Sequence, residues 1–330
     1  MKSKRFVQAL RRSLVALAVL GSVSSTAVAS YSQVVFFGDS LSDTGNLYRA
    51  TGFTVPASPP YFNGRFSNGP LWSETLAGYL GLTATPSLSG GTNNAWAGAT
   101  VVDYGRFPPE LPQQLDLYLL ATSGKADPGV LYVILGGAND INDAGKTATP
   151  VANVQAAAQG VDAMVDKLYG AGARNILVSN LPDIGLTPRA IAGGVAGFAS
   201  ALTNVFNATL AGLLDADDVA YADLDLDRLD LFALLNNVVK NPASYGFGNV
   251  TDPCLTAAGV CADPGSYLFW DDFHPTTRGH SFIADTALRA VPEPTTLLLI
   301  GISLAAFGLL ASRRGRRPET LFSTGVAVER

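Results

Sequence analysis

Four short, largely apolar runs constrain the fold of this 330-residue chain more than any other feature. A strand that is apolar on both faces fits the interior of a parallel sheet covered by helices on each side. The sequence therefore predicts buried strands over Gln33–Phe37, Val130–Leu135, Asn175–Ser179 and Val219–Ala222.

Helical spacing occupies the stretches between and after these runs. In Val154, Ala157, Val161, Val165 and Leu168 the apolar residues recur every three or four positions, as in an amphipathic helix. We expect helices over Leu71–Leu80, Val151–Tyr169, Val195–Leu214 and Thr277–Ala290. Strands that alternate with helices predict a three-layer α/β/α domain.

The first 29 residues have the pattern of a secretory signal peptide. A basic start is followed by the apolar run Leu14–Leu20 and by Ala27-Val28-Ala29, a suitable cleavage site. The run is shorter than the roughly 20 apolar residues that a membrane span needs. An uncleaved anchor or a buried first helix is the alternative, and export is the interpretation that the pattern favours.

The other end of the domain predicts a membrane segment. Pro292-Glu293-Pro294 precedes an uncharged stretch at 295–312, and four arginines follow within residues 313–317. Such a stretch is long enough to span, and the positive-inside rule places the arginines in the cytoplasm. A buried core helix is the alternative, but clustered arginines are uncommon at the end of a core helix.

This order of features resembles the PEP-CTERM sorting signal of Gram-negative bacteria. The resemblance implies that residues 291–317 are recognised by an exosortase during export, with residues 318–330 as a short tail. We expect the protein in the periplasm, at the cell surface or outside the cell, with at least transient anchoring in the inner membrane.

Between the two ends, residues 30–290 are strongly acidic. They hold 24 Asp and Glu against 12 Lys and Arg, a net charge of −12. This balance excludes a nucleic-acid partner, whose phosphates are bound by Lys and Arg. The length suits one α/β domain.

Two features raise the question of a metal or a disulfide. Cys254 and Cys261 are the only cysteines. In an exported protein they favour a small disulfide loop over a metal site completed by Asp252 and Asp263. The aspartate-rich run 215–230 lacks the turn glycine and the final glutamate of a calcium loop, so we interpret it as solvated surface. The sequence predicts no metal and no cofactor.

A serine, a histidine and two aspartates supply the parts of a hydrolytic site. Ser40 follows the first predicted strand, at the carboxyl edge where open α/β sheets place their sites. His274 is one of two histidines, and Asp271 lies three residues before it. That spacing lets the carboxylate orient the imidazole, while Asp272 is less well placed. His280 lies inside a predicted helix, where packing or surface exposure is the simpler role.

Acyl transfer also needs hydrogen-bond donors that are already in place for an oxyanion. Gly98 can present a backbone N–H with no Cβ in the way. Asn139 follows the predicted strand Val130–Leu135, so its amide is expected at the same sheet edge as Ser40. Taken singly, both are ordinary turn residues.

The ordered set of motifs resembles the GDSL-type esterases and lipases of the SGNH hydrolase superfamily, over residues 33–290. The blocks that carry it are Phe37–Asn46, Asn63–Glu74, Asn93–Thr100, Gly137–Asp140, Asn241–Asn249 and Phe269–Thr276. Ala97 stands where many members have a glycine. The resemblance implies a flavodoxin-like sheet, Ser40 as nucleophile, His274 as base and Asp271 as its orienting partner. The Ser40 N–H, Gly98 and Asn139 would form the oxyanion hole.

We therefore expect an exported serine esterase or lipase that acts on a small-molecule, lipid or acylated-sugar ester. Two alternatives stay open. One is a carbohydrate O-deacetylase acting on extracellular polysaccharide, and the other is a non-catalytic protein that binds such a polysaccharide at the surface. Acyl preference would depend on loops such as Gly52–Phe62, whose aromatic residues include Tyr61, and Phe107–Leu120.

Overall fold

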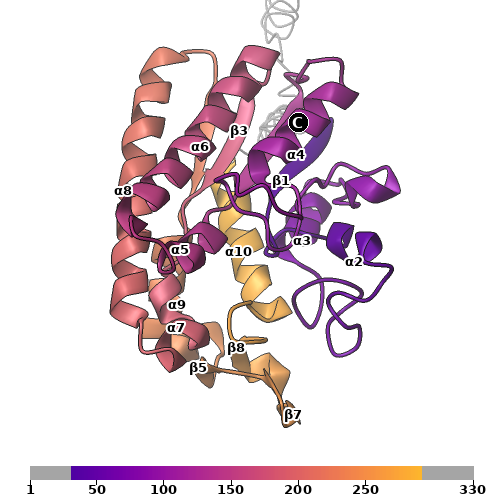
Figure 1. The fold of residues 1–330 in the computed structure, drawn as a ribbon. Helices are drawn as coiled ribbons and strands as arrows, with labels where there is room; N and C mark the ends of the chain where they lie inside the picture. The colour runs from indigo at the N-terminus through magenta and orange to yellow at the C-terminus, as the bar shows by residue number, and fades with distance from the viewer. Residues whose placement is uncertain (1–30, 292–330) are drawn as a thin grey trace, which may run out of the picture. The chain divides into compact units, whose positions relative to one another are not determined.

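A parallel sheet of four strands lies at the centre of residues 31–291, the part of the chain that the computed structural model describes (Figure 1). Its strand order is β1-β2-β3-β4, and all three pairings are parallel. The strands are β1 (Gln33–Gly38), β2 (Val130–Leu135), β3 (Asn175–Ser179) and β4 (Asp225–Leu229). The predicted parallel α/β architecture is confirmed.

An extended segment lies along the free edge of β1 without forming a regular strand. The Phe36 N–H donates to Thr92 O at 3.2 Å, Asn94 N–H to Phe36 O at 2.8 Å, and Trp96 N–H to Gly38 O at 3.0 Å. These bonds extend the parallel hydrogen-bonding pattern of the sheet beyond β1, as an additional strand would. As a result, residues 97 and 98 come out at the same edge of the sheet as the residues that follow β1.

Helices cover both faces of the sheet, which gives the three layers (Figure 1). One apolar cluster contains side chains of α4 (Leu111–Ala121), α6 (Pro150–Ala171) and α8 (Ala196–Ala220), and the cluster on the opposite face contains α3 (Trp72–Tyr79) and α10 (Thr277–Ala290). All six residues of β2 are buried, because the strand contributes side chains to both clusters.

Shorter elements complete the carboxyl edge and the C-terminal part. Two small sheets pair β5 with β8 in parallel and β6 with β7 in antiparallel, and a disulfide joins Cys254 to Cys261. The remaining elements are α2 (Asn46–Ala50), α5 (Ala138–Ala144), α7 (Pro188–Ala192), α9 (Leu231–Lys240), β5 (Asn249–Pro253), β6 (Leu255–Thr256), β7 (Gly259–Val260) and β8 (Tyr267–Phe269).

The prediction of a strand over Val219–Ala222 is wrong. Helix α8 extends to Ala220, and the last strand of the four-stranded sheet is β4, inside the aspartate-rich run that we interpreted as solvated surface. β4 pairs only with β3 and lies at the edge of the sheet, so several of its residues stay partly exposed. An uncovered edge strand does not need the continuous apolar pattern that marked β1, β2 and β3.

Within residues 31–291, α8 is the one helix long and apolar enough to cross a membrane. It is a core helix, because it packs along α6 and buries Leu202, Phe206 and Leu210 in the main apolar cluster. The predicted signal peptide at 1–29 and the predicted span at 295–312 lie outside the described residues.

Candidate active site

Ser40 lies in the tight turn directly after β1 and is 5% exposed. Gly38 ends the strand so close to β2 that a Cβ there would come within 2.5 Å of Leu135 O. The side-chain amide of Gln114, on α4, bonds both the N–H and the carbonyl of Gly38 at 2.9 Å. Neighbouring strand and helix thus fix the backbone that presents the Ser40 hydroxyl.

Asp43 connects this turn to the segment that lies beside β1. Its carboxylate accepts the N–H groups of Gly45 at 2.8 Å, Asn46 at 2.6 Å, Leu47 at 3.1 Å and Ala97 at 2.9 Å. The Ala97 bond matters most for the site, because Ala97 directly precedes Gly98. The nucleophile turn and the glycine loop are therefore held by one buried side chain.

His274 lies between Ser40 and Asp271, in the loop that joins β8 to α10. Its Nε2 is 2.7 Å from Ser40 Oγ, and its Nδ1 is 2.8 Å from Asp271 Oδ2. The other carboxylate oxygen of Asp271 accepts the N–H groups of Phe273 at 2.8 Å and His274 at 2.7 Å. With Nδ1–H donating to Asp271, Nε2 is left to accept the serine hydroxyl.

Asp271 is held in its ionised form. Burial alone raises the pKa of Asp271, but the facing His274 and the bonds from two backbone N–H groups outweigh that effect and hold the pKa well below its usual range. Tyr61 donates a further hydrogen bond to Oδ2 at 2.8 Å. An ionised, well-bonded carboxylate keeps the imidazole in one tautomer and stabilises its protonated form.

Asp272, the competing carboxylate, points elsewhere. It pairs with Arg189 of α7 through two contacts of 2.8 and 3.2 Å, and its carbonyl accepts the Arg189 N–H at 2.8 Å. Its side chain is 53% exposed, against 14% for Asp271. The three-residue spacing, rather than the two-residue one, brings a carboxylate to the imidazole.

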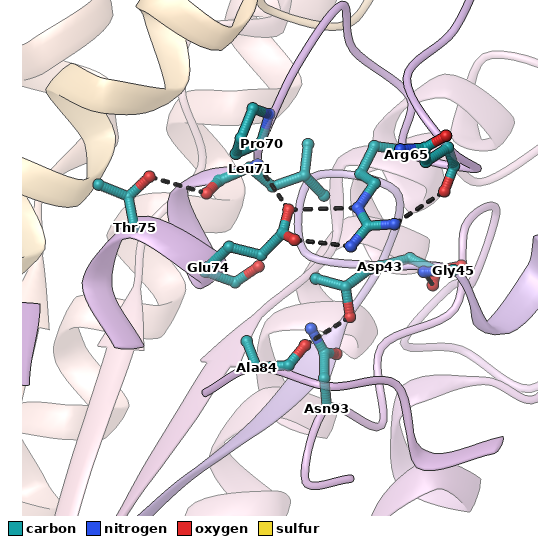
Figure 2. A network of polar contacts seen from close by, with 12 residues as sticks. Asp43, Gly45, Arg65, Pro70, Leu71, Glu74, Thr75, Ala84 and Asn93 are labelled. Atoms are coloured by element: carbon teal, nitrogen blue, oxygen red, sulfur yellow. Dashed lines mark hydrogen bonds and ion pairs between the residues drawn. The ribbon is translucent and has the colours of Figure 1, made fainter. Parts of the chain in front are cut away.

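The segment 63–74 packs against the loop that contains His274. Ser67 Oγ donates to Pro275 O at 2.9 Å, and Phe66 packs on the His274 ring with centroids 5.0 Å apart. Figure 2 shows the ion pair that closes this segment: Arg65 and Glu74 are joined at 2.6 and 3.2 Å. Glu74 also accepts the N–H of Leu71 at 2.9 Å, at the start of α3.

The two other predicted donors lie at the same sheet edge. Gly98 has φ +86°, a backbone conformation that favours glycine. Asn139, in the first turn of α5, donates one amide hydrogen to Ala99 O at 2.8 Å, which ties it to the glycine loop. Among the hydrogen bonds of residues 31–291, none uses the backbone N–H of Ser40 or of Gly98.

Two further carboxylates lie under the site with raised pKa values. Burial raises the pKa of Asp39 to about 6, and one of its oxygens has no partner within the described part of the chain. Burial also raises the pKa of Asp140 to about 6, although the Val101 and Val102 N–H groups bond it at 2.8 and 3.0 Å. Asp140 thereby fixes the chain just beyond the glycine loop.

His280 takes no part in this arrangement. It is fully buried in α10, and burial, with the charge of His274, lowers its pKa to about 3, so it stays neutral. The residues that sequence analysis missed are Tyr61 and Arg189, which contact the two neighbouring aspartates. Tyr61 is 210 positions from Asp271, and no local pattern marks it as a partner.

Comparison with protein families accounts for the order of these blocks. Residues 34–287 match the model of the GDSL-like lipase/acylhydrolase family. The chain belongs to this family. Residues 290–317 match the PEP-CTERM protein-sorting motif, which indicates export and membrane-associated sorting in Gram-negative bacteria. Both resemblances drawn from the sequence are confirmed.

Curated relatives in the family include acyltransferases and esterases. The chain is 30% identical over 322 residues to a phosphatidylcholine-sterol acyltransferase of Aeromonas hydrophila, covering 94% of this chain and 87% of the relative. It is 32% identical to the esterase EstA of Pseudomonas aeruginosa over 87% of this chain, but it spans only 51% of that relative. Family membership identifies the domain as a hydrolase of ester bonds.

Comparison with solved structures finds esterases of low sequence identity. An acetyl xylan esterase is 18% identical and overlaps 79% of this chain and all of its own, with a TM-score of 0.43. A catalytic mutant of an acetylxylan esterase from Geobacillus stearothermophilus is 15% identical, overlaps 78% of this chain and 93% of its own, and has a TM-score of 0.46.

Proposed function

We propose that the domain is a serine esterase in which Ser40 is the nucleophile, His274 the general base and Asp271 the orienting carboxylate. The observation that carries this proposal is the position of His274, bonded to Ser40 Oγ at 2.7 Å on one side and to Asp271 at 2.8 Å on the other. A serine hydroxyl becomes a strong nucleophile only when a correctly oriented base takes its proton.

The reaction proceeds through an acyl-enzyme. As Ser40 Oγ attacks the ester carbonyl, its proton passes to His274 Nε2, and the bond to the alcohol breaks when Nε2 returns that proton to the leaving oxygen. Water then attacks the acyl-serine, again through His274, and the acid is released with Ser40 restored. Asp271 stays ionised throughout and stabilises the imidazolium.

The oxyanion hole consists of the Ser40 and Gly98 N–H groups and the second amide hydrogen of Asn139. The two N–H groups bond no acceptor within residues 31–291, so they are available to an oxygen that becomes negative during attack. Because Asp43 fixes the Gly98 loop and Ala99 fixes Asn139, these donors need little rearrangement in the transition state.

Replacing Ser40 with Ala tests the mechanism. We expect the kcat on p-nitrophenyl butyrate to fall by about 10⁴-fold or more, because the nucleophile is gone. Ser89→Ala, at an exposed serine, is the matched control and keeps full activity. Substantial hydrolysis by Ser40→Ala would contradict the assignment.

Labelling by a fluorophosphonate probe separates the esterase from a non-catalytic polysaccharide-binding protein. We expect covalent labelling of the wild-type protein and of Ser89→Ala, and none of Ser40→Ala. A wild-type protein that resists the probe and hydrolyses no ester would favour the binding role.

We also propose the route of export. Residues 1–29 act as a signal peptide, residues 30–290 form the exported domain, and residues 291–317 hold it at the inner membrane through 295–312 until an exosortase acts. Deleting 291–317 is expected to release active enzyme into the periplasm or medium. An unchanged membrane-bound fraction would count against the tail as anchor.

A further inference from the structure

A cavity with almost purely apolar walls is lined by residues that are next in the chain to the proposed catalytic residues. Its volume is about 60 Å³. It lies where three apolar clusters of the molecule meet: Phe273 and Ile184 belong to the first, Leu41 and Leu231 to the second, and Val238, Leu268 and Phe269 to the third. Protein interiors leave few voids larger than a water molecule, so this gap in the packing is unusual.

The walls of the cavity are neighbours of the reacting groups in the chain. Leu41 follows Ser40, Ala138 precedes Asn139, and Phe273 and Pro275 flank His274. The nucleophile, an oxyanion donor and the base are therefore each one residue away from the lining. An ester bound at Ser40 would therefore have its carbonyl group close to this space.

The chemistry of the lining selects for an apolar occupant. Thr187 carries the one side-chain hydroxyl among the lining residues, and that hydroxyl already donates to Ile184 O at 2.7 Å. A sugar hydroxyl placed here would lose its hydrogen bonds to water without replacement, which is costly. A hydrocarbon chain loses nothing, and apolar cavities of proteins bind such groups.

A second cleft adjoins the cavity. It has a volume of about 250 Å³ and is lined by α5, α7 and the first turn of α8. Ile184, Thr187 and Phe273 line both spaces, so these three side chains form the partition between them. Phe273 is held there by Arg189, whose guanidinium lies 4.5 Å from the ring centre.

We propose that this cavity is the acyl-chain subsite, and that the enzyme prefers esters of medium-chain fatty acids to acetyl esters. The inference rests on the proposed serine mechanism and names its substrate class. A water molecule needs about 10–15 Å³ of such space, so the cavity takes about four to six carbon atoms. With the first carbons still beside Ser40, this corresponds to acyl chains of about six to eight carbons.

The test is a series of p-nitrophenyl esters from acetate to decanoate. For the wild-type enzyme we expect kcat/KM to rise by up to about fourfold for each buried methylene, and to level off near octanoate. Val238 is a buried residue of α9 on the cavity wall, and in Val238→Phe the larger aromatic side chain fills the space. We expect kcat/KM for octanoate to fall at least about tenfold and that for acetate to change less than about twofold.

Val219→Phe is the matched control, because Val219 is 84% exposed on α8 and far from the lining. It should keep the wild-type chain-length profile. Leu235→Ala is the opposite change: it enlarges the cavity and should move the preferred chain length upward. It also keeps the proposal testable if the larger ring prevents Val238→Phe from folding.

The outcomes separate the two proposals. If Ser40-dependent labelling and acetate hydrolysis persist, but Val238→Phe or Leu235→Ala changes all chain lengths equally, the cavity is only a packing defect and the acyl subsite is wrong. A wild-type preference for acetate over octanoate would also overturn it. If Ser40→Ala hydrolyses every ester as well as the wild type, the serine mechanism itself fails.

Discussion

The two halves of the candidate active site are built differently. The nucleophile half, residues 38–46 with 92–98, is buried and held by backbone hydrogen bonds to a few polar side chains. Asp43 alone accepts four N–H groups, and the Asn46 amide donates to the carbonyls of Asn93 and Ala95 at 2.8 and 2.9 Å. These bonds join the turn after β1 to α2 and to the segment that lies beside β1.

The base half, residues 270–275, is held by side chains from outside the sheet. Tyr61 reaches Asp271, Phe66 covers His274, and Arg189 pairs with Asp272. These side chains come from a long loop and a short helix, and several are partly exposed. Removing one of them takes away the contacts of one side chain rather than a buried network.

The difference indicates which property each half controls. Buried polar networks contribute strongly to stability, because a donor or acceptor left without a partner is costly. Contacts that orient an imidazole affect the transition state while contributing little to folding. We expect substitutions in the nucleophile half to lower the free energy of unfolding, and substitutions in the base half to lower kcat.

The largest effect is expected in the base half, for Asp271→Asn. The amide no longer stabilises the imidazolium or the required tautomer, so kcat should fall by about 10³- to 10⁴-fold. Asp272→Asn is the matched control, one residue away and paired with Arg189 at the surface, and should stay within about twofold. Equal losses in the two variants would show that the spacing argument chose the wrong carboxylate.

The next effect lies in the nucleophile half, for Asp43→Asn. The amide places N–H donors where the carboxylate accepted the Leu47 and Ala97 N–H groups, so we expect the free energy of unfolding to fall by about 3 kcal/mol. Urea denaturation measures it. Asp103→Asn, at an exposed loop position, controls for the lost charge. If the two variants unfold at the same urea concentration, the network contributes less than its geometry indicates.

The pH dependence of stability tests the same comparison at Asp39, a residue of the nucleophile half. Its pKa is raised to about 6 in the folded protein, so between about pH 4 and 6 the folded state binds a proton that the unfolded chain has lost. Asp39 therefore contributes stability at acid pH that is lost as the pH rises through this window. The side chain of Asp39→Asn cannot titrate. Between pH 4 and 7 the free energy of unfolding of this variant should therefore fall by about 2 kcal/mol less than that of the wild-type protein.

The check is a series of urea denaturations at pH values from 4 to 7. Asp140, whose pKa is also raised to about 6, stays in both proteins, and because the charge of Asp39 contributes to that shift, the difference between them reports Asp39 together with a smaller change at Asp140. Parallel stability curves would contradict a raised pKa at this position. The base half supplies the contrast, because Asp271 is ionised across the whole range and gives no such change.

The sequence predicted the parts of the molecule that depend on local patterns. β1, β2 and β3 were predictable because burial on both faces demands continuous apolar residues. β4 was not, because an edge strand tolerates Asp225 and Asp227 among its residues. The helices α4 and α9 were missed as well, although each buries an apolar face.

The candidate site divides in the same way. Ser40, His274 and Asp271 lie in short motifs, and their spacing carries information about geometry. Tyr61 and Arg189 approach from 210 and 83 positions away, and neither belongs to a motif of its own. Which loop covers the base depends on tertiary packing, and this is why the sequence predicted only that the loop containing Tyr61 affects acyl preference.

Tyr61→Phe is the smallest change and the sharpest probe of that tertiary contact. The ring keeps its packing against Phe66 and Trp270, but Asp271 Oδ2 loses a donor at 2.8 Å. Because a hydrogen bond to a charged group contributes about 1.5–3 kcal/mol, we expect kcat to fall by about tenfold. KM should hardly change, since the substrate contacts are untouched.

Tyr79→Phe provides the matched control, because Tyr79 also donates to an aspartate, Asp285, at 2.9 Å but on the exposed surface. It should keep wild-type kcat. If Tyr61→Phe also keeps wild-type kcat, the four remaining hydrogen-bond contacts of Asp271 and His274 suffice to hold the base, and the outer loop only covers the site. A tenfold loss confined to kcat would instead make Tyr61 a positioning residue, which acts on the reaction through Asp271.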